Sequence, residues 1–149
     1  MARLVTAVPE SEWKWYGSPG HFILAFNCRF HMLTRVGGYI VCTIGENFPD
    51  APVREIMAQS RGITLEGKGD ARIQDYMQKI GFDPMGASDC KYETLVFPYG
   101  HDCKESSCGG CGLPKPSTWT EIDGTRWMTA AEATKGHMGY CRQYAKVNP

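Results

Sequence analysis

Gly37 and Gly38 form a two-residue break between two runs rich in β-branched and aromatic residues. A Gly-Gly loop supplies the positive φ angles that a type I′ hairpin turn requires, so the two runs are expected to pair as antiparallel strands. Because the length of a hairpin loop sets the register, four opposed pairs can be named. They are Val36 with Tyr39, Leu33 with Cys42, His31 with Ile44, and Arg29 with Glu46.

Two further strands are expected around this hairpin. The run 21–26 has the same composition as the hairpin strands, and the run 92–97 ends at Pro98 and Gly100, which are typical strand terminators. On the hairpin, Cys42 is expected to pack beside Leu33 and Ile40 as a small buried hydrophobe, because free cysteine is among the most buried residue types.

Helix signals occur at three places. The ranges 50–62 and 70–80 each end at a glycine stop, and the second shows an apolar stripe with helical spacing. A third helix is expected from Ala130 to about Tyr144. Its start carries a capping-box pattern, in which Thr129 and Glu132 satisfy each other's backbone N–H groups.

These elements predict one α+β domain over residues 1–149, since the length suits a single core. We expect a small antiparallel sheet with the Gly-Gly hairpin, two or three helices, and a zinc-knuckle-like C-terminal loop plus helix. Residues 1–20 are expected to be an irregular N-terminal segment, and 98–149 a C-terminal subregion stapled by a metal.

Composition excludes some classes of protein and leaves others open. Lys plus Arg total 16 and Asp plus Glu total 16, so charge gives no support to binding of nucleic acid or anionic lipid, although nucleic acid is not excluded. No apolar run reaches the roughly 18 residues of a membrane helix, and the N-terminus lacks the apolar core of a signal peptide. The sequence therefore predicts a cytoplasmic protein that does not enter a membrane.

The cysteines indicate a metal site rather than a disulfide framework. Seven cysteines is an odd number in a chain without a secretion signal. Cys103, Cys108 and Cys111 fall within nine residues, and Cys-Gly-Gly-Cys allows a tight turn that brings two sulfurs to one ion. About thirty residues later, His137 and Cys141 are four apart and share one face of the expected helix.

Thiolates and imidazole at these spacings suit tetrahedral zinc. The preferred ligand set is Cys103, Cys108, Cys111 and Cys141, with His137 able to replace one of them. A surplus of protein ligands favours a closed, structural zinc site. The alternatives are reduced, solvated thiols with His137 packed on the helix, or a disulfide such as Cys103–Cys108.

No residue is assigned a catalytic role. Cys28 and His31 could be a nucleophile and its base, but residues three apart in a strand point to opposite faces, so structural roles are favoured. Tryptophan and arginine are enriched at interface hot spots. Trp13, Trp15, Arg126 and Trp127 are therefore the candidates for a partner surface, beside the alternative that each covers the core.

Five short runs carry a resemblance to a class of proteins. They are Gly20–Ile23, Cys28–His31, Val41–Glu46, Lys91–Phe97 and Gly136–Met138. In these runs the chain resembles small uncharacterised proteins encoded by tailed bacteriophages and prophages. The resemblance transfers no activity, but it implies a compact intracellular phage accessory protein of a size used to bind and block a host machine such as a defence complex.

The sequence thus supports three functional hypotheses. The first is a non-enzymatic, metal-stapled phage protein that inhibits or remodels a host protein or ribonucleoprotein complex by binding it. The second is a metal- or cysteine-dependent hydrolase. The third is a zinc-knuckle nucleic-acid binder, which is weaker because the cysteine-rich loop has few basic residues.

Overall fold

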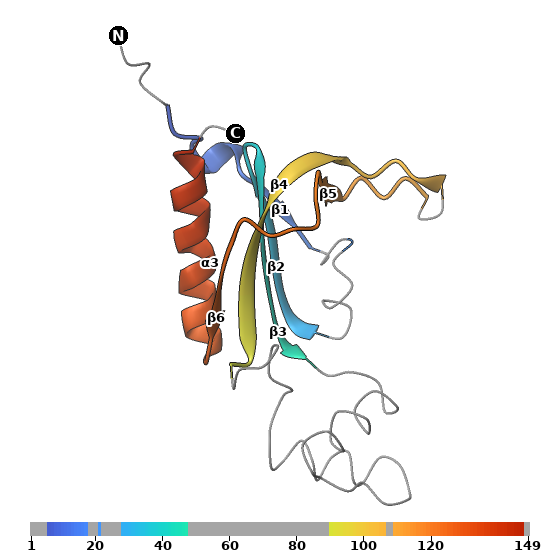
Figure 1. The fold of residues 1–149 in the computed structure, drawn as a ribbon. Helices are drawn as coiled ribbons and strands as arrows, with labels where there is room; N and C mark the ends of the chain where they lie inside the picture. The colour runs from blue at the N-terminus through green and yellow to red at the C-terminus, as the bar shows by residue number, and fades with distance from the viewer. Residues whose placement is uncertain (1–5, 18–20, 22–27, 48–89, 107–108, 148–149) are drawn as a thin grey trace, which may run out of the picture.

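The computed structural model describes residues 6–17, 21, 28–47, 90–106 and 109–147. Within them a short 3₁₀ helix, η1, is followed by six strands and one α-helix (Figure 1). The bounds are η1 (Glu10–Glu12), β1 (Lys14–Tyr16), β2 (Cys28–Val36), β3 (Tyr39–Asn47), β4 (Tyr92–Asp102), β5 (Pro114–Pro116), β6 (Asp123–Trp127) and α3 (Ala130–Ala145).

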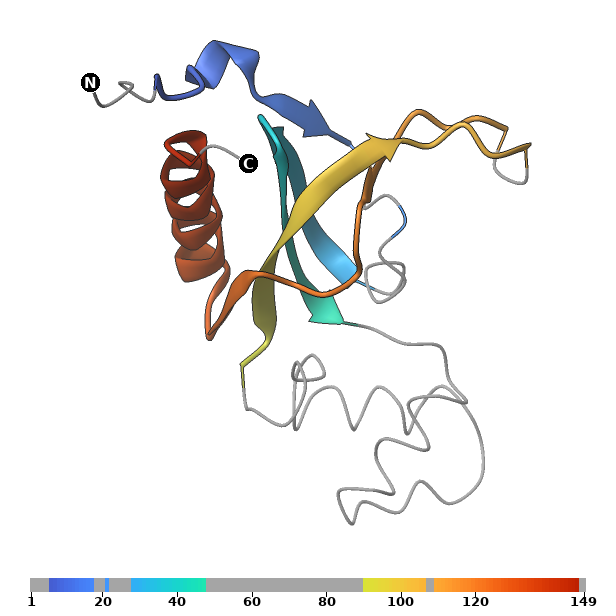
Figure 2. The same ribbon diagram turned by 45° about the horizontal axis from the view of Figure 1, so that its top comes forward.

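The six strands form one antiparallel sheet with the order β1-β2-β3-β4-β5, and β6 pairs with β4. β4 is the longest strand and its two halves have different neighbours. Its first half lies between β3 and β6, and its second half pairs with β5. Figure 2 shows the sheet curled into a half-barrel with α3 against one face. One long, bent strand therefore joins the helix-covered part of the sheet to the β4–β5 hairpin.

The predicted register of the β2–β3 hairpin is confirmed. Val36 pairs with Tyr39, and the register continues through Leu33–Cys42 and His31–Ile44. Gly37 has a φ of 57°, in the left-handed region that L-residues with a side chain avoid. The turn chemistry of the sequence thus sets the centre of the sheet.

Both faces of β3 are buried from Tyr39 to Gly45, which explains why this strand is mostly apolar. On the side of α3, which we call the helix-side core, the cluster is Trp13, Val36, Tyr39, Val41, Val96, Cys141, Tyr144 and Ala145. On the other side, the opposite-side core, it is Cys28, Leu33, Ile40, Cys42, Ile44 and Phe97. The expected burial of Cys42 beside Leu33 and Ile40 is confirmed.

The C-terminal helix has the predicted position. α3 begins after Thr129, whose hydroxyl accepts a hydrogen bond from the Glu132 N–H at 3.1 Å. The Glu132 carboxylate reaches back one residue further than expected and accepts from the Met128 N–H at 3.4 Å. Among the described residues no helix has the length and apolarity needed to span a bilayer.

The predicted fold class, an α+β chain with two or three helices, is wrong. The described residues are mostly sheet, with one α-helix beside six strands. The helices expected over 50–62 and 70–80, and most of the strand expected over 21–26, lie outside the described residues. The sheet is larger than expected because β1, β5 and β6 are short and carry little β pattern of their own.

Pairing partners, rather than local propensity, make these short segments strands. β5 contains two prolines and pairs only with the end of β4 among the described strands, which fits the confinement of proline to sheet edges. β4 also runs past its expected end at Pro98. Gly100 lies at a register shift, where an added Cβ would be 2.8 Å from the Ser117 nitrogen. Glycine there permits a bend instead of a stop.

Candidate metal centre

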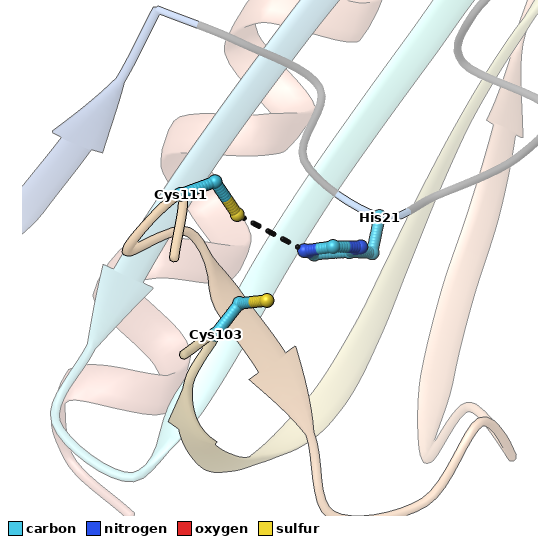
Figure 3. A group of neighbouring side chains, drawn as sticks. All are labelled: His21, Cys103 and Cys111. Atoms are coloured by element: carbon cyan, nitrogen blue, oxygen red, sulfur yellow. Dashed lines mark hydrogen bonds between the residues drawn. The ribbon is translucent and has the colours of Figure 1, made fainter. Parts of the chain in front are cut away.

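Three side chains of types that can bind a metal ion lie together at the β4–β5 hairpin. They are His21, Cys103 and Cys111, and one ligand atom from each lies within 4.8 Å of the others. The His21 Nε2 atom is 3.2 Å from the Cys111 Sγ atom (Figure 3). Figure 3 also shows the Cys103 sulfur directed towards the same space. We call this group the His-Cys-Cys cluster.

The hairpin backbone places the two cysteines side by side. β4 ends at Asp102, and the Cys103 N–H then donates to the Leu113 carbonyl at 2.8 Å. The Gly112 N–H returns a bond to the Cys103 carbonyl at 3.0 Å. Because Cys111 directly precedes Gly112, its side chain lies next to Cys103.

Glycines shape the loop that carries Cys111. Gly109, Gly110 and Gly112 have φ angles of 67°, 62° and 72°, a conformation that costs a residue with a Cβ about 1–2 kcal/mol. The Gly110 N–H also donates to the Glu105 carbonyl at 2.9 Å. The predicted role of the Cys-Gly-Gly-Cys glycines in a tight turn fits this geometry.

The cluster lies at the boundary between protein and solvent. Cys103 is fully buried, His21 is half-buried and Cys111 is exposed. Beside the cluster, Lys115 Nζ lies 2.6 Å from Glu105 Oε1. The hydrogen bond and charge of Lys115 lower the pKa of Glu105, and His21 adds a smaller effect in the same direction.

The structure places His137 elsewhere, under α3 and against the sheet. Its Nε2 atom lies 2.8 Å from Thr34 Oγ1 and its Nδ1 atom 2.7 Å from Thr43 Oγ1. The side chain is fully buried, and burial lowers the pKa of His137 to about 4. Both ring nitrogens are thus engaged by hydroxyl groups.

The hydroxyl contacts extend across three strands. Thr43 Oγ1 lies 2.7 Å from Thr94 Oγ1, which accepts a hydrogen bond from the Trp127 indole N–H at 2.9 Å. An indole can only donate, so Thr94 can donate onward to Thr43, and Thr43 to Nδ1 of His137. Nε2 then carries the proton and donates to Thr34. We call this set the threonine–histidine network.

Cys141 belongs to the same buried layer. It lies one turn after His137 on α3, as predicted, in the helix-side core. Burial raises the pKa of its thiol to about 12, and Thr34 hydrogen-bonds it. Of the five predicted ligands, the structure therefore brings Cys103 and Cys111 together and leaves His137 and Cys141 in the core. Cys108 lies outside the described residues, and its ligation stays a prediction.

The sequence did not predict that His21 lies beside Cys103 and Cys111. His21 lies 90 positions from Cys111, so no local spacing links the two residues. The one signal in the sequence was that histidine is a residue type that can bind a metal ion. The i, i+4 spacing of His137 and Cys141 correctly indicated a shared helix face. It did not show that this face is turned towards the sheet.

The four candidate partner residues divide between surface and core. Trp13 is 8% exposed within the helix-side core, and Trp127 packs its ring over Gly136 while it donates to Thr94. Arg126 is exposed, and its Nε atom lies 2.9 Å from the Glu93 carboxylate. Trp15 is 48% exposed, with its ring centroid 5.6 Å from that of His137.

The Cys28–His31 pair does not have the geometry of an activated nucleophile. Cys28 lies in the opposite-side core, where burial raises the pKa of its thiol to about 11. Reactive cysteines have lowered pKa values. The Nδ1 atom of His31 is buried without a hydrogen-bond partner.

Comparisons with protein-family models, with curated proteins and with solved structures found no match.

Proposed function

We propose that this chain is a non-enzymatic phage accessory protein that binds a host protein or ribonucleoprotein complex, such as a defence complex, and inhibits or remodels it in the bacterial cytoplasm. The main observation in support of a binding surface is that Trp15, a large aromatic side chain on strand β1, is 48% exposed. The phage context comes from the sequence resemblance described above.

The surroundings of Trp15 suit a partner contact. β1 is the first strand in the sheet order and pairs with β2 alone among the described strands. An edge strand presents backbone N–H and C=O groups that an extended segment of a partner can pair with. A half-exposed tryptophan beside such an edge combines apolar area with backbone recognition, which supports binding at this side of the sheet.

The thiols of the sheet favour binding over cysteine-dependent hydrolysis. Burial raises the pKa of Cys28 to about 11 and that of Cys42 to about 12, so both are protonated thiols near pH 7. The nucleic-acid alternative gains little from the hairpin, because Lys115 is ion-paired with Glu105.

The proposal is tested by capture of partners from bacterial host lysate, followed by direct binding to the purified partner. Trp15→Ala should weaken that affinity about thirtyfold, the effect of removing a hot-spot side chain worth about 2 kcal/mol. The matched control is Trp119→Ala, because Trp119 is 53% exposed but packs its edge near Phe97 on β4.

Circular dichroism checks that both variants fold like the parent chain. Wild-type affinity in a folded Trp15→Ala variant would remove Trp15 from the interface. Equal losses in both variants would show that tryptophan exposure in general, and not the β1 edge, controls binding.

A further inference from the structure

We infer that His21, Cys103 and Cys111 form a binding site for a zinc-class divalent cation, with one imidazole and two thiolates as protein ligands. This ligand set replaces the helix-borne His137 and Cys141 with a histidine from the N-terminal segment. The site is independent of the proposed partner surface, since neither Trp15 nor β1 takes part in it.

The spacing of the donor atoms fits a tetrahedral ion. Zinc–sulfur bonds of about 2.3 Å and zinc–nitrogen bonds of about 2.0 Å place ligand atoms roughly 3.5–3.8 Å apart around a tetrahedron. The three ligand atoms lie within 4.8 Å of one another, and the His21–Cys111 distance is 3.2 Å. The His21–Cys111 pair would have to separate by about 0.3 Å, and any pair at the 4.8 Å limit would have to close by about 1 Å.

The chemistry of the donors selects the class of ion. Two thiolates and an imidazole are soft or borderline ligands that suit zinc, whereas magnesium and calcium require oxygen donors. Both cysteines are thiols rather than halves of a disulfide. Metal binding would convert them to thiolates at neutral pH, because the ion replaces their protons.

Backbone hydrogen bonds hold the cysteine-bearing hairpin in this geometry without an ion. Cys103 is fixed by backbone bonds to Leu113 and Gly112, and the loop is closed by the Glu105–Gly110 bond. The third ligand, His21, comes from a distant part of the chain. A bound ion would therefore cross-link the segment before β2 to the β4–β5 hairpin.

A simpler interpretation of the same distances is a hydrogen bond between His21 and the Cys111 thiol. The two interpretations predict different responses of the protein to added metal. The hydrogen bond needs no ion, whereas the proposed site should bind one zinc per chain and should also accept cobalt, whose thiolate complexes absorb visible and near-ultraviolet light.

The experiment is a titration of the reduced, full-length chain with Zn²⁺ against a chromophoric chelator, and with Co²⁺ by absorbance. His21→Ala and Cys111→Ser should each weaken zinc affinity more than about a hundredfold, since losing a group that merely supports a ligand already costs 10–100-fold. His101→Ala, on the same hairpin, and Cys141→Ala, in the core, should leave the affinity within about threefold.

Stability measured with chelator present separates ligand loss from misfolding. Without metal, His21→Ala and Cys111→Ser should unfold at the same temperature as the parent chain. A wild-type chain that takes up no zinc, or a folded His21→Ala variant with unchanged affinity, would overturn the site. A loss of zinc in Cys141→Ala together with unchanged affinity in His21→Ala would restore the helix-borne ligand set instead.

Discussion

Two regions of the molecule each place a histidine near a cysteine, but in opposite settings: the threonine–histidine network, which has Cys141 as a neighbour, and the His-Cys-Cys cluster. In the network, His137 is fully buried and both its nitrogens meet hydroxyl groups, and the neighbouring Cys141 thiol is buried. In the cluster, His21 is half-buried and Cys111 is exposed on a glycine-rich loop. Residue type alone therefore does not distinguish a core histidine from a candidate ligand.

The two histidines differ in whether a ring nitrogen has a lone pair available for a metal ion. A ring that donates from one nitrogen and accepts at the other has no site left for an ion. Helical spacing shows which residues share a face. The threonines on β2, β3 and β4 show what that face contacts.

Removal of His137 should have the largest effect on stability. His137→Ala deletes a fully buried ring and leaves the Thr34 and Thr43 hydroxyls without it, so we expect a loss of about 4 kcal/mol in unfolding free energy. Urea unfolding in chelator measures this loss, with His21→Ala as the control, expected to change stability by less than about 0.5 kcal/mol. Similar losses of unfolding free energy in the two variants would show that the buried and the half-buried histidine contribute equally to stability, which would contradict this prediction.

The pH dependence of stability should also identify His137. Its folded pKa is about 4 and its ordinary value is 6.5, so the unfolded chain binds the proton more readily between these limits. The stabilisation is complete above pH 6.5 and falls by about 3 kcal/mol as the pH drops to 4. The stability of the parent chain should fall relative to that of His137→Gln in this window, because glutamine does not titrate. Parallel curves would contradict a neutral buried imidazole.

Zinc should stabilise the chain through the cluster and not through the network. At a free zinc concentration a hundred times the dissociation constant, the gain is about 2.7 kcal/mol, visible as a higher melting temperature. Cys111→Ser should abolish the gain, whereas Cys141→Ala, although less stable, should keep it. A zinc-dependent shift that survives in Cys111→Ser would assign the ion to another place.

The smallest effects should come from two glycine substitutions of opposite sign. Gly110 has a φ of 62° and open space around its missing Cβ, so Gly110→Ala should cost about 1–2 kcal/mol through backbone strain. Gly139 lies exposed within α3, also with open space, and Gly139→Ala should add up to about 1 kcal/mol through helix propensity. Thermal unfolding compares the two. A neutral Gly110→Ala would show that the loop is not held in the left-handed conformation.

Local signals predicted the centre of the fold well. The Gly-Gly turn gave the β2–β3 register, and the Thr129–Glu132 pattern gave the start of α3, because both depend on residues within a few positions of one another. The strand over 92–97 was also expected, although β4 continues to Asp102.

Features that depend on distant partners could not be predicted in the same way. β6 has the sequence Asp-Gly-Thr-Arg-Trp, and it is a strand because β4 offers it a pairing edge. His21 joins Cys103 and Cys111 across most of the chain, and no spacing rule covers such a separation. The burial of Trp13 and the packing of Trp127 likewise follow from where α3 lies.

The pairing of β3 with β4 has a consequence for how the chain could be altered. Gly45 is paired with Tyr92, and a Cβ added at Gly45 would overlap the Tyr92 ring. Any larger residue at position 45 would therefore have to displace this ring or separate the two strands. Near the end of a mostly apolar strand, the absence of a side chain is what allows the aromatic ring of the neighbouring strand to lie across it.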